Sequence, residues 1–106
     1  MEIKQLTNNC NFKGLNIAKL SDYHLKKYVL PVLPELKTLG EKADVFLCSR
    51  WNMELRAPML EYAVKPLNAK GDNNILRWTP IGTGYNTFSP NTIINKIKGL
   101  VQNINS

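Results

Sequence analysis

Residues that bind metals or act as nucleophiles are scarce in this sequence. It has one histidine, His24, and two well-separated cysteines, Cys10 and Cys48. Structural zinc sites need four Cys or His ligands in closely spaced pairs, and the sequence has no such pattern. We therefore expect no metal and no cofactor. His24 is expected at the surface or in a helix cap, because no nearby residue marks it as catalytic.

The two cysteines do not indicate a disulfide framework, which a domain of 106 residues does not need. Cys48 ends the apolar run Val45–Cys48 and is predicted to be a buried, inert thiol. Cys10 lies in an asparagine-rich stretch and is expected to be more accessible. A Cys–His pair built from distant parts of the chain is the basis of our third-ranked hypothesis, a small enzyme with a cysteine nucleophile.

Long hydrophobic runs are also missing. No apolar stretch approaches the roughly 18 residues that a membrane-spanning helix needs. The segment Met1–Lys4 lacks the basic and then apolar pattern of a secretory signal. We therefore expect a cytoplasmic protein that does not act at a membrane.

Acidic residues are missing from the last third of the chain, after Asp72. The charged side chains in that part are Arg77, Lys96 and Lys98. A second basic group consists of Lys19, Lys26 and Lys27. The formal net charge of +6 favours an anionic partner, such as nucleic acid or an acidic protein surface. Solubility is the alternative explanation, because this charge is ordinary for a small domain and is scattered along the chain.

The overall composition is that of an ordinary globular protein, with 43% hydrophobic and 21% charged residues. We expect one domain, residues 1–106. The thirteen asparagines, together with many Ile and Lys residues, are typical of an A·T-rich genome. This usage suggests a phage or low-GC bacterial origin and says nothing about chemistry.

The clearest element is a C-terminal helix over Pro90–Ile104. Ser89 is a good N-cap, and Pro90 occupies a position where its missing N–H has no intrahelical partner. Its apolar residues recur at helical spacing and are Ile93, Ile97, Leu100, Val101 and Ile104. Such a stripe predicts a helix that packs on the chain's own sheet or on a partner.

The middle of the chain predicts a β-hairpin over Tyr62–Thr79. Two strand-like segments, 62–67 and 75–79, flank the turn-forming residues 68–74. Pro66 cannot donate to a ladder, so its strand should be at an edge or bulged there. Residues 80–88 are expected to form a loop.

The first half of the chain is less clear. Ser21 should cap a helix that breaks near Leu30, with a second short helix from about Pro34 to Gly40; one kinked helix is the alternative. The segment Ala43–Leu55 fits a buried strand or a helix, and periodicity does not separate the two. We predict an α+β fold: a small antiparallel sheet that includes the Tyr62–Thr79 hairpin, packed by two or three helices.

Arginine stands beside tryptophan twice, at Arg50-Trp51 and Arg77-Trp78. Such pairs suit single-stranded nucleic acid or the centre of a protein interface. We predict a core position for Trp78, while Trp51 is equally compatible with core and surface. The candidate binding residues are Arg50, Trp51, Arg56, Arg77, Tyr85, Lys96 and Lys98.

Two further patterns have ordinary explanations. Glu54 and Glu61 are central carboxylates, but Arg50 and Lys65 stand four residues from them, as in surface ion pairs on a helix. The glycines at 82 and 84 precede a helix without forming a phosphate-binding motif, so we predict a plain loop.

No catalytic motif is present, so we rank an enzyme below the two binding functions. The first hypothesis is a small protein-interaction module, such as a regulator or inhibitor of a larger complex. The alternative is a nucleic-acid-binding accessory protein that uses a basic face. The scattered charge favours the protein partner, whose identity the sequence does not give; it also gives no oligomeric state.

Overall fold

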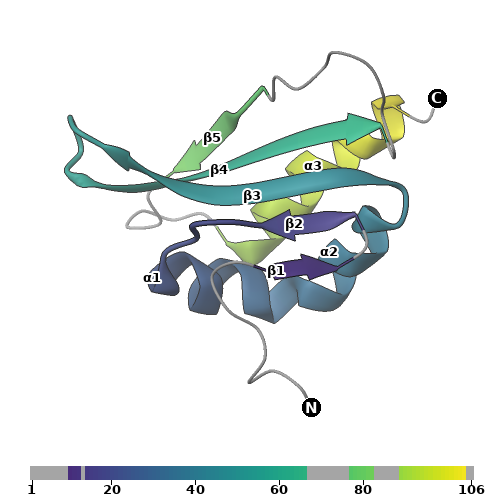
Figure 1. Ribbon diagram of the computed structural model, residues 1–106, viewed down its shortest axis with the longest axis horizontal. Coiled ribbons are helices and arrows are strands. Elements are labelled where there is room, and N and C mark those ends of the chain that lie inside the picture. The colour runs from purple at the N-terminus through teal and green to yellow at the C-terminus, as the bar shows by residue number, and fades with distance from the viewer. Residues whose placement is uncertain (1–9, 13, 67–76, 83–88, 105–106) are drawn as a thin grey trace.

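The computed structural model describes residues 10–12, 14–66, 77–82 and 89–104 (Figure 1). The strands are β1 (Cys10–Phe12), β2 (Leu15–Ile17), β3 (Ala43–Asn52), β4 (Ala57–Pro66) and β5 (Thr79–Gly82). The helical elements are α1 (Asp22–His24), η2 (Leu25–Val29), η3 (Leu30–Val32), α2 (Leu33–Gly40) and α3 (Pro90–Ile104). The predicted α+β class is confirmed.

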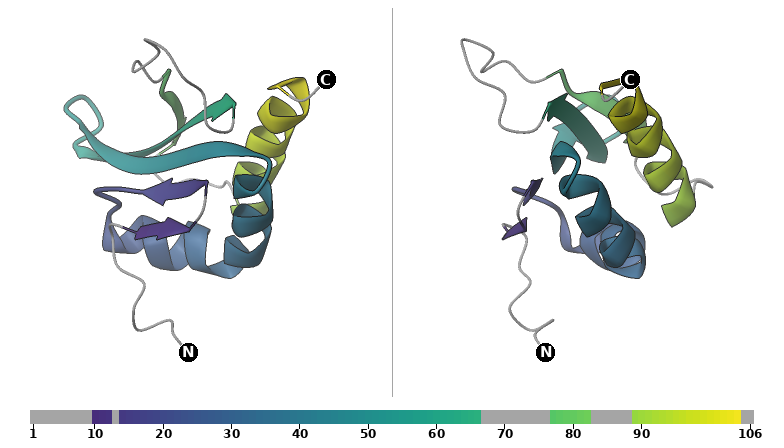
Figure 2. Two further views of the ribbon diagram at one scale, coloured as in Figure 1. Left: turned by 45° about the vertical axis from the view of Figure 1, so that its right-hand side comes forward. Right: turned by 90° about the vertical axis from the view of Figure 1, so that its right-hand side faces the viewer.

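The strands form one mostly antiparallel sheet in the order β1-β2-β3-β4-β5. β2 and β3 pair in parallel, and the helical segment from α1 to α2 connects them. The other neighbouring strands pair in antiparallel fashion. The helices pack on one side of the sheet, as the two further views show (Figure 2). The opposite side, which we call the open face, has no described helix over it.

The helical crossover begins at Ser21, whose side chain accepts a hydrogen bond from the backbone N–H of His24, as the N-cap prediction required. The segment does not stop at Leu30 but changes its hydrogen-bonding pattern there. The π-helical turn η2 leads into the 3₁₀ turn η3, and α2 begins at Leu33. Pro31 explains the change, because it has no N–H and its ring clashes with a regular preceding turn.

The ambiguous segment Ala43–Leu55 is a strand through Asn52, so the helical alternative is wrong. Ala43, Val45 and Leu47 alternate into the core, and all ten residues of β3 pair with β4. This long-range pairing decides between two conformations that the local sequence permits equally.

The predicted hairpin is present between β4 and β5, which pair Tyr62 with Thr79. Its second strand is displaced: Thr79–Gly82 is a strand and not the start of a loop, whereas residues 67–76 lie outside the described part. β4 lies between β3 and β5, so the prediction that its strand is at an edge or bulged at Pro66 is wrong. The described irregularity in β4 is between Leu60 and Glu61.

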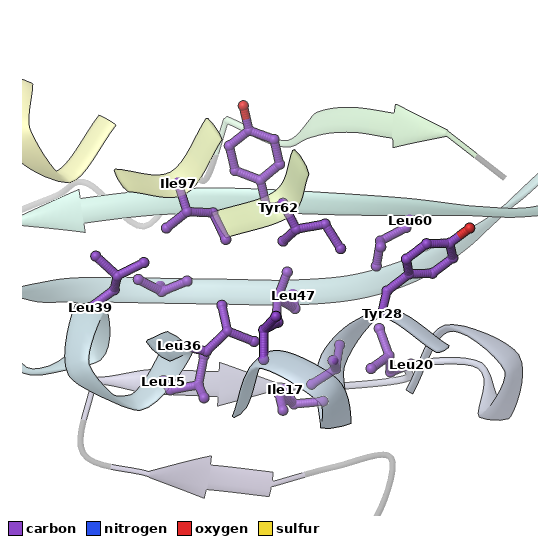
Figure 3. Packing of buried hydrophobic residues seen from close by; sticks show 14 of the residues in the cluster. Leu15, Ile17, Leu20, Tyr28, Leu36, Leu39, Leu47, Leu60, Tyr62 and Ile97 are labelled. Carbon is purple, nitrogen blue, oxygen red and sulfur yellow. The ribbon is translucent and has the colours of Figure 1, made fainter. Parts of the chain in front are cut away.

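The predicted C-terminal helix is confirmed from Pro90 to Ile104. Ile93, Ile97 and Val101 are buried, and Leu100 is half-buried. Figure 3 shows Ile97 among side chains from β3, β4 and the crossover, including Leu47 and Tyr62. The apolar stripe therefore packs on the chain's own sheet. The side chain of Ile104 lies outside the described part.

Candidate functional site

The β3–β4 hairpin extends past the ends of β2 and β5 and closes with a short turn (Figure 1). Residues 53–56 connect Asn52 to its strand partner Ala57. The Asn52 side-chain oxygen accepts a hydrogen bond from the backbone N–H of Leu55 at 2.8 Å, so it stabilises the turn. Arg56 ends the turn in the left-handed region, with φ of 53°.

Large apolar side chains are exposed at this turn. Trp51, Met53 and Leu55 are 58%, 78% and 57% exposed, respectively. Among the described residues, the one other exposed large hydrophobic side chain is Tyr23, at 38%. Together with Arg50 and Arg56, which are also exposed, Trp51, Met53 and Leu55 form what we call the tip surface. A cluster of exposed apolar groups is more informative than a single one, since it is typical of an interaction site.

Ser49 fixes the beginning of the helical crossover beside the base of the tip. The backbone N–H of Ser21 donates to the Ser49 hydroxyl oxygen at 2.8 Å. His24 Nδ1 and the same oxygen share a hydrogen bond at 2.7 Å. Tyr23 lies between these two contacts in the sequence, so it is held at the same end of the molecule as the tip surface.

The side chain of His24 is fully buried, and the prediction of a surface position is wrong. The cap of this helix is Ser21, whose hydroxyl accepts a hydrogen bond from the backbone N–H of His24, so a capping role for His24 itself stays a prediction. A buried imidazole needs a hydrogen-bond partner, and Ser49 supplies it from a strand 25 residues further along the chain. No local pattern around His24 reveals so distant a partner.

The structure brings together three of the predicted binding residues, Arg50, Trp51 and Arg56, at the tip. Arg77 is exposed just before β5, and Lys96 and Lys98 are exposed on α3, which stands apart from the tip (Figures 1 and 2). Tyr85 lies outside the described residues. Met53 and Leu55 were not predicted, although the turn-forming Asn52 just before them is a usable signal.

Trp78 is not part of the tip. It is half-buried and meets the ring of Phe46 edge-on, with 6.5 Å between the ring centroids. Phe46 alternates along β3 with the buried Val45 and Leu47, so this aromatic contact lies on the open face. The predicted core position of Trp78 is therefore wrong: the side chain packs against Phe46 on the open face, outside the buried cluster.

The two central glutamates do not form an acid–base pair. Glu54 is exposed in the turn, whereas Glu61 lies on β4 opposite Cys48. Arg50 contacts Glu61 across the strands, with 3.4 Å between Arg50 Nε and Glu61 Oε1. This contact replaces the helical ion pairs that the sequence suggested, because both residues are in strands.

Cys48 is half-buried on the open face, so the prediction of a buried position is wrong. Burial raises the pKa of its thiol above the ordinary value, and the negative charge of Glu61 raises the pKa further. The thiol is therefore protonated at neutral pH, as expected of an unreactive cysteine.

In a Cys10→Ser variant, we expect the Cys48 thiol to react with a disulfide reagent more slowly than the thiol of a short unstructured peptide at the same mildly alkaline pH. The reason is the smaller thiolate fraction that follows from the raised pKa. Ellman's reagent measures both rates. The Cys10→Ser, Cys48→Ser double variant should retain partner binding with a modest loss of stability. A Cys48 thiol faster than the peptide's would point instead to an activated nucleophile.

Within residues 10–12, 14–66, 77–82 and 89–104, no three His, Cys, Asp or Glu side chains are grouped so that they could hold a metal ion. None of the helices formed by these residues has the length and apolar character needed to cross a membrane. The chain matches no protein-family model, no curated protein and no solved structure.

Proposed function

We propose that this protein is a small, non-enzymatic interaction module of the cytoplasm, such as a regulator or inhibitor of a larger complex, and that it docks through the tip surface. The observation behind the proposal is the exposure of Trp51, Met53 and Leu55 on one projecting turn. Burying one side chain of this size contributes about 1.5–3 kcal/mol. Trp, Met and Arg are also enriched in protein interfaces, and Trp and Arg dominate their energetic centres.

The surroundings of Cys48, a candidate nucleophile, and of His24, the candidate base, support a role without catalysis. The His24 ring is buried and hydrogen-bonded to Ser49, so it is not presented to a substrate. The Cys48 thiol lies opposite Glu61, which disfavours the thiolate that a nucleophilic cysteine needs.

Nucleic-acid binding is the second candidate, favoured by the adjacent and exposed side chains of Arg50 and Trp51. An exposed tryptophan can stack on a base while an arginine contacts phosphate. We rank it second because Met53 and Leu55 offer no stacking surface.

A Trp51→Ser, Leu55→Ser double variant should fold normally and lose most partner capture. Tagged wild-type protein, this variant and a Lys98→Ala control would be incubated with extract of the native host, with and without nuclease. We expect protein capture that survives nuclease and moderate salt, is lost in the double variant and persists in the control. Urea midpoints of all three proteins would verify folding.

Capture that disappears after nuclease treatment would favour the nucleic-acid candidate. Equal capture by the wild type and the double variant would contradict docking through the tip.

A further inference from the structure

Resting on the proposed function, we propose that the tip surface fits an apolar pocket whose border is lined with Asp and Glu side chains of a partner protein. Arg50 and Arg56 flank the apolar residues of the turn in the sequence and are exposed. In the segment beside the base of the tip, Lys19, Lys26 and Lys27 are exposed, and the exposed carboxylates of the two segments are Asp22 and Glu54. The excess of positive charge complements an acidic border.

Hydrogen bonds of Lys19 and Lys27 place both residues near the base of the tip surface. The backbone carbonyl of Lys19 accepts a hydrogen bond from the N–H of Ser49 at 3.3 Å, which places Lys19 beside the base of the tip. The Lys27 ammonium donates to the Tyr23 hydroxyl at 2.9 Å and lies 5.2 Å from the centre of that ring. Charge and apolar surface are therefore adjacent in both segments, as expected of a desolvated interface centre with a charged rim.

Arg50 retains capacity for a carboxylate of the partner. Its contact with Glu61 involves Nε at 3.4 Å, and its side chain is 60% exposed. A guanidinium has five N–H donors, so the remaining ones can bind a second carboxylate in a paired geometry. Among cations, arginine is the side chain best suited to this recognition.

Arg56 provides a sharp test because its backbone is in the left-handed region, with φ of 53°. In such a conformation a side chain is unfavourable and glycine is preferred. Arg56→Gly should therefore keep or improve the turn while it removes the cation. Loss of affinity in this variant would report the charge and not the fold.

The aliphatic side chains favour a protein pocket over nucleic acid, since Met53, the most exposed of them, stacks poorly on bases. Anionic lipid is the other class of surface that would accept an apolar tip with adjacent cations. The experiment therefore tests nucleic acid and anionic lipid as competing ligands of the tip surface.

The probe is a phage-displayed library of short random peptides. It would be panned against wild-type protein, with counter-selection on the Trp51→Ser, Leu55→Ser variant. We expect the enriched peptides to combine apolar residues with Asp or Glu. Their affinity should fall with added salt and drop about three- to tenfold in Arg56→Gly and in Arg50→Gln, as for charged contacts at an interface. Lys98→Gln, which removes the same charge on α3, should bind as wild type.

Each other result has a defined meaning. Tip-dependent peptides that are neutral or basic, or full affinity in Arg56→Gly and Arg50→Gln, would overturn the acidic pocket and leave the proposed function standing. A failure to enrich any tip-dependent peptide would overturn both the acidic pocket and the proposed docking through the tip surface. Stronger tip-dependent binding to oligothymidine or to phosphatidylglycerol vesicles would overturn the pocket and assign the surface to nucleic acid or to lipid.

Discussion

Replacing Gly14 with alanine is expected to destabilise the protein by about 3 kcal/mol or more. A Cβ atom at this position would overlap the backbone carbonyl of Gly40 and lie 2.7 Å from the carbonyl oxygen of Ala43. Neither atom can move away easily, because Gly40 ends α2 and Ala43 begins the central strand β3. The backbone carbonyl of Gly14 also accepts a short hydrogen bond, 2.7 Å long, from the N–H of Val45.

Urea unfolding followed by circular dichroism would measure this loss. Gly99→Ala is the matched control, since a Cβ atom at Gly99 in α3 would meet no atom within 4 Å. Alanine in a helix interior is favoured over glycine by roughly 0.5–1 kcal/mol, so this variant should gain stability. Equal urea midpoints for Gly14→Ala and wild type would show that the backbone at Gly14 is not in close contact with the backbone at Gly40 and Ala43.

Replacing Ile97 with alanine should lower the free energy of unfolding by about 2–5 kcal/mol. Ile97 is fully buried between α3 and the sheet, where Figure 3 shows it among the core side chains. The loss combines the transfer of apolar surface to water with the cavity that remains. The urea midpoint measures the effect.

Lys98→Ala is the control for Ile97→Ala, because Lys98 is the exposed neighbour on the same helix and its replacement should change stability little. An unchanged midpoint for Ile97→Ala would mean that the stripe on α3 does not stabilise the fold.

The sequence predicts α3 within its observed bounds because the local information there is consistent. Ser89, Pro90 and the apolar stripe all favour the same start and the same face. Ala43–Leu55 was undecided because its apolar run suits two conformations, and pairing with β4 determines which one forms. The displacement of β5 has a similar origin, since its register is set by contact with residues 60–62.

The candidate site was predicted in part. Arg50, Trp51 and Arg56 were chosen for their chemistry, but their proximity depends on a hairpin that the sequence did not resolve. Met53 and Leu55 were missed because an apolar residue in a tight turn resembles a core residue until its exposure is known. The burial of His24 depends on Ser49, whose position only the tertiary fold determines.

The two neighbours of the central strand β3 are joined to it by very different lengths of chain. β4 follows after the short turn of residues 53–56, whereas the whole helical crossover separates β2 from β3. Closing a short loop loses less chain entropy, and contacts between residues distant in sequence form slowly. The β3–β4 hairpin should therefore assemble early in folding from local contacts, with β1 and β2 joining after the crossover packs. The tip surface thus belongs to a part of the sheet that should form from local contacts, before the crossover packs.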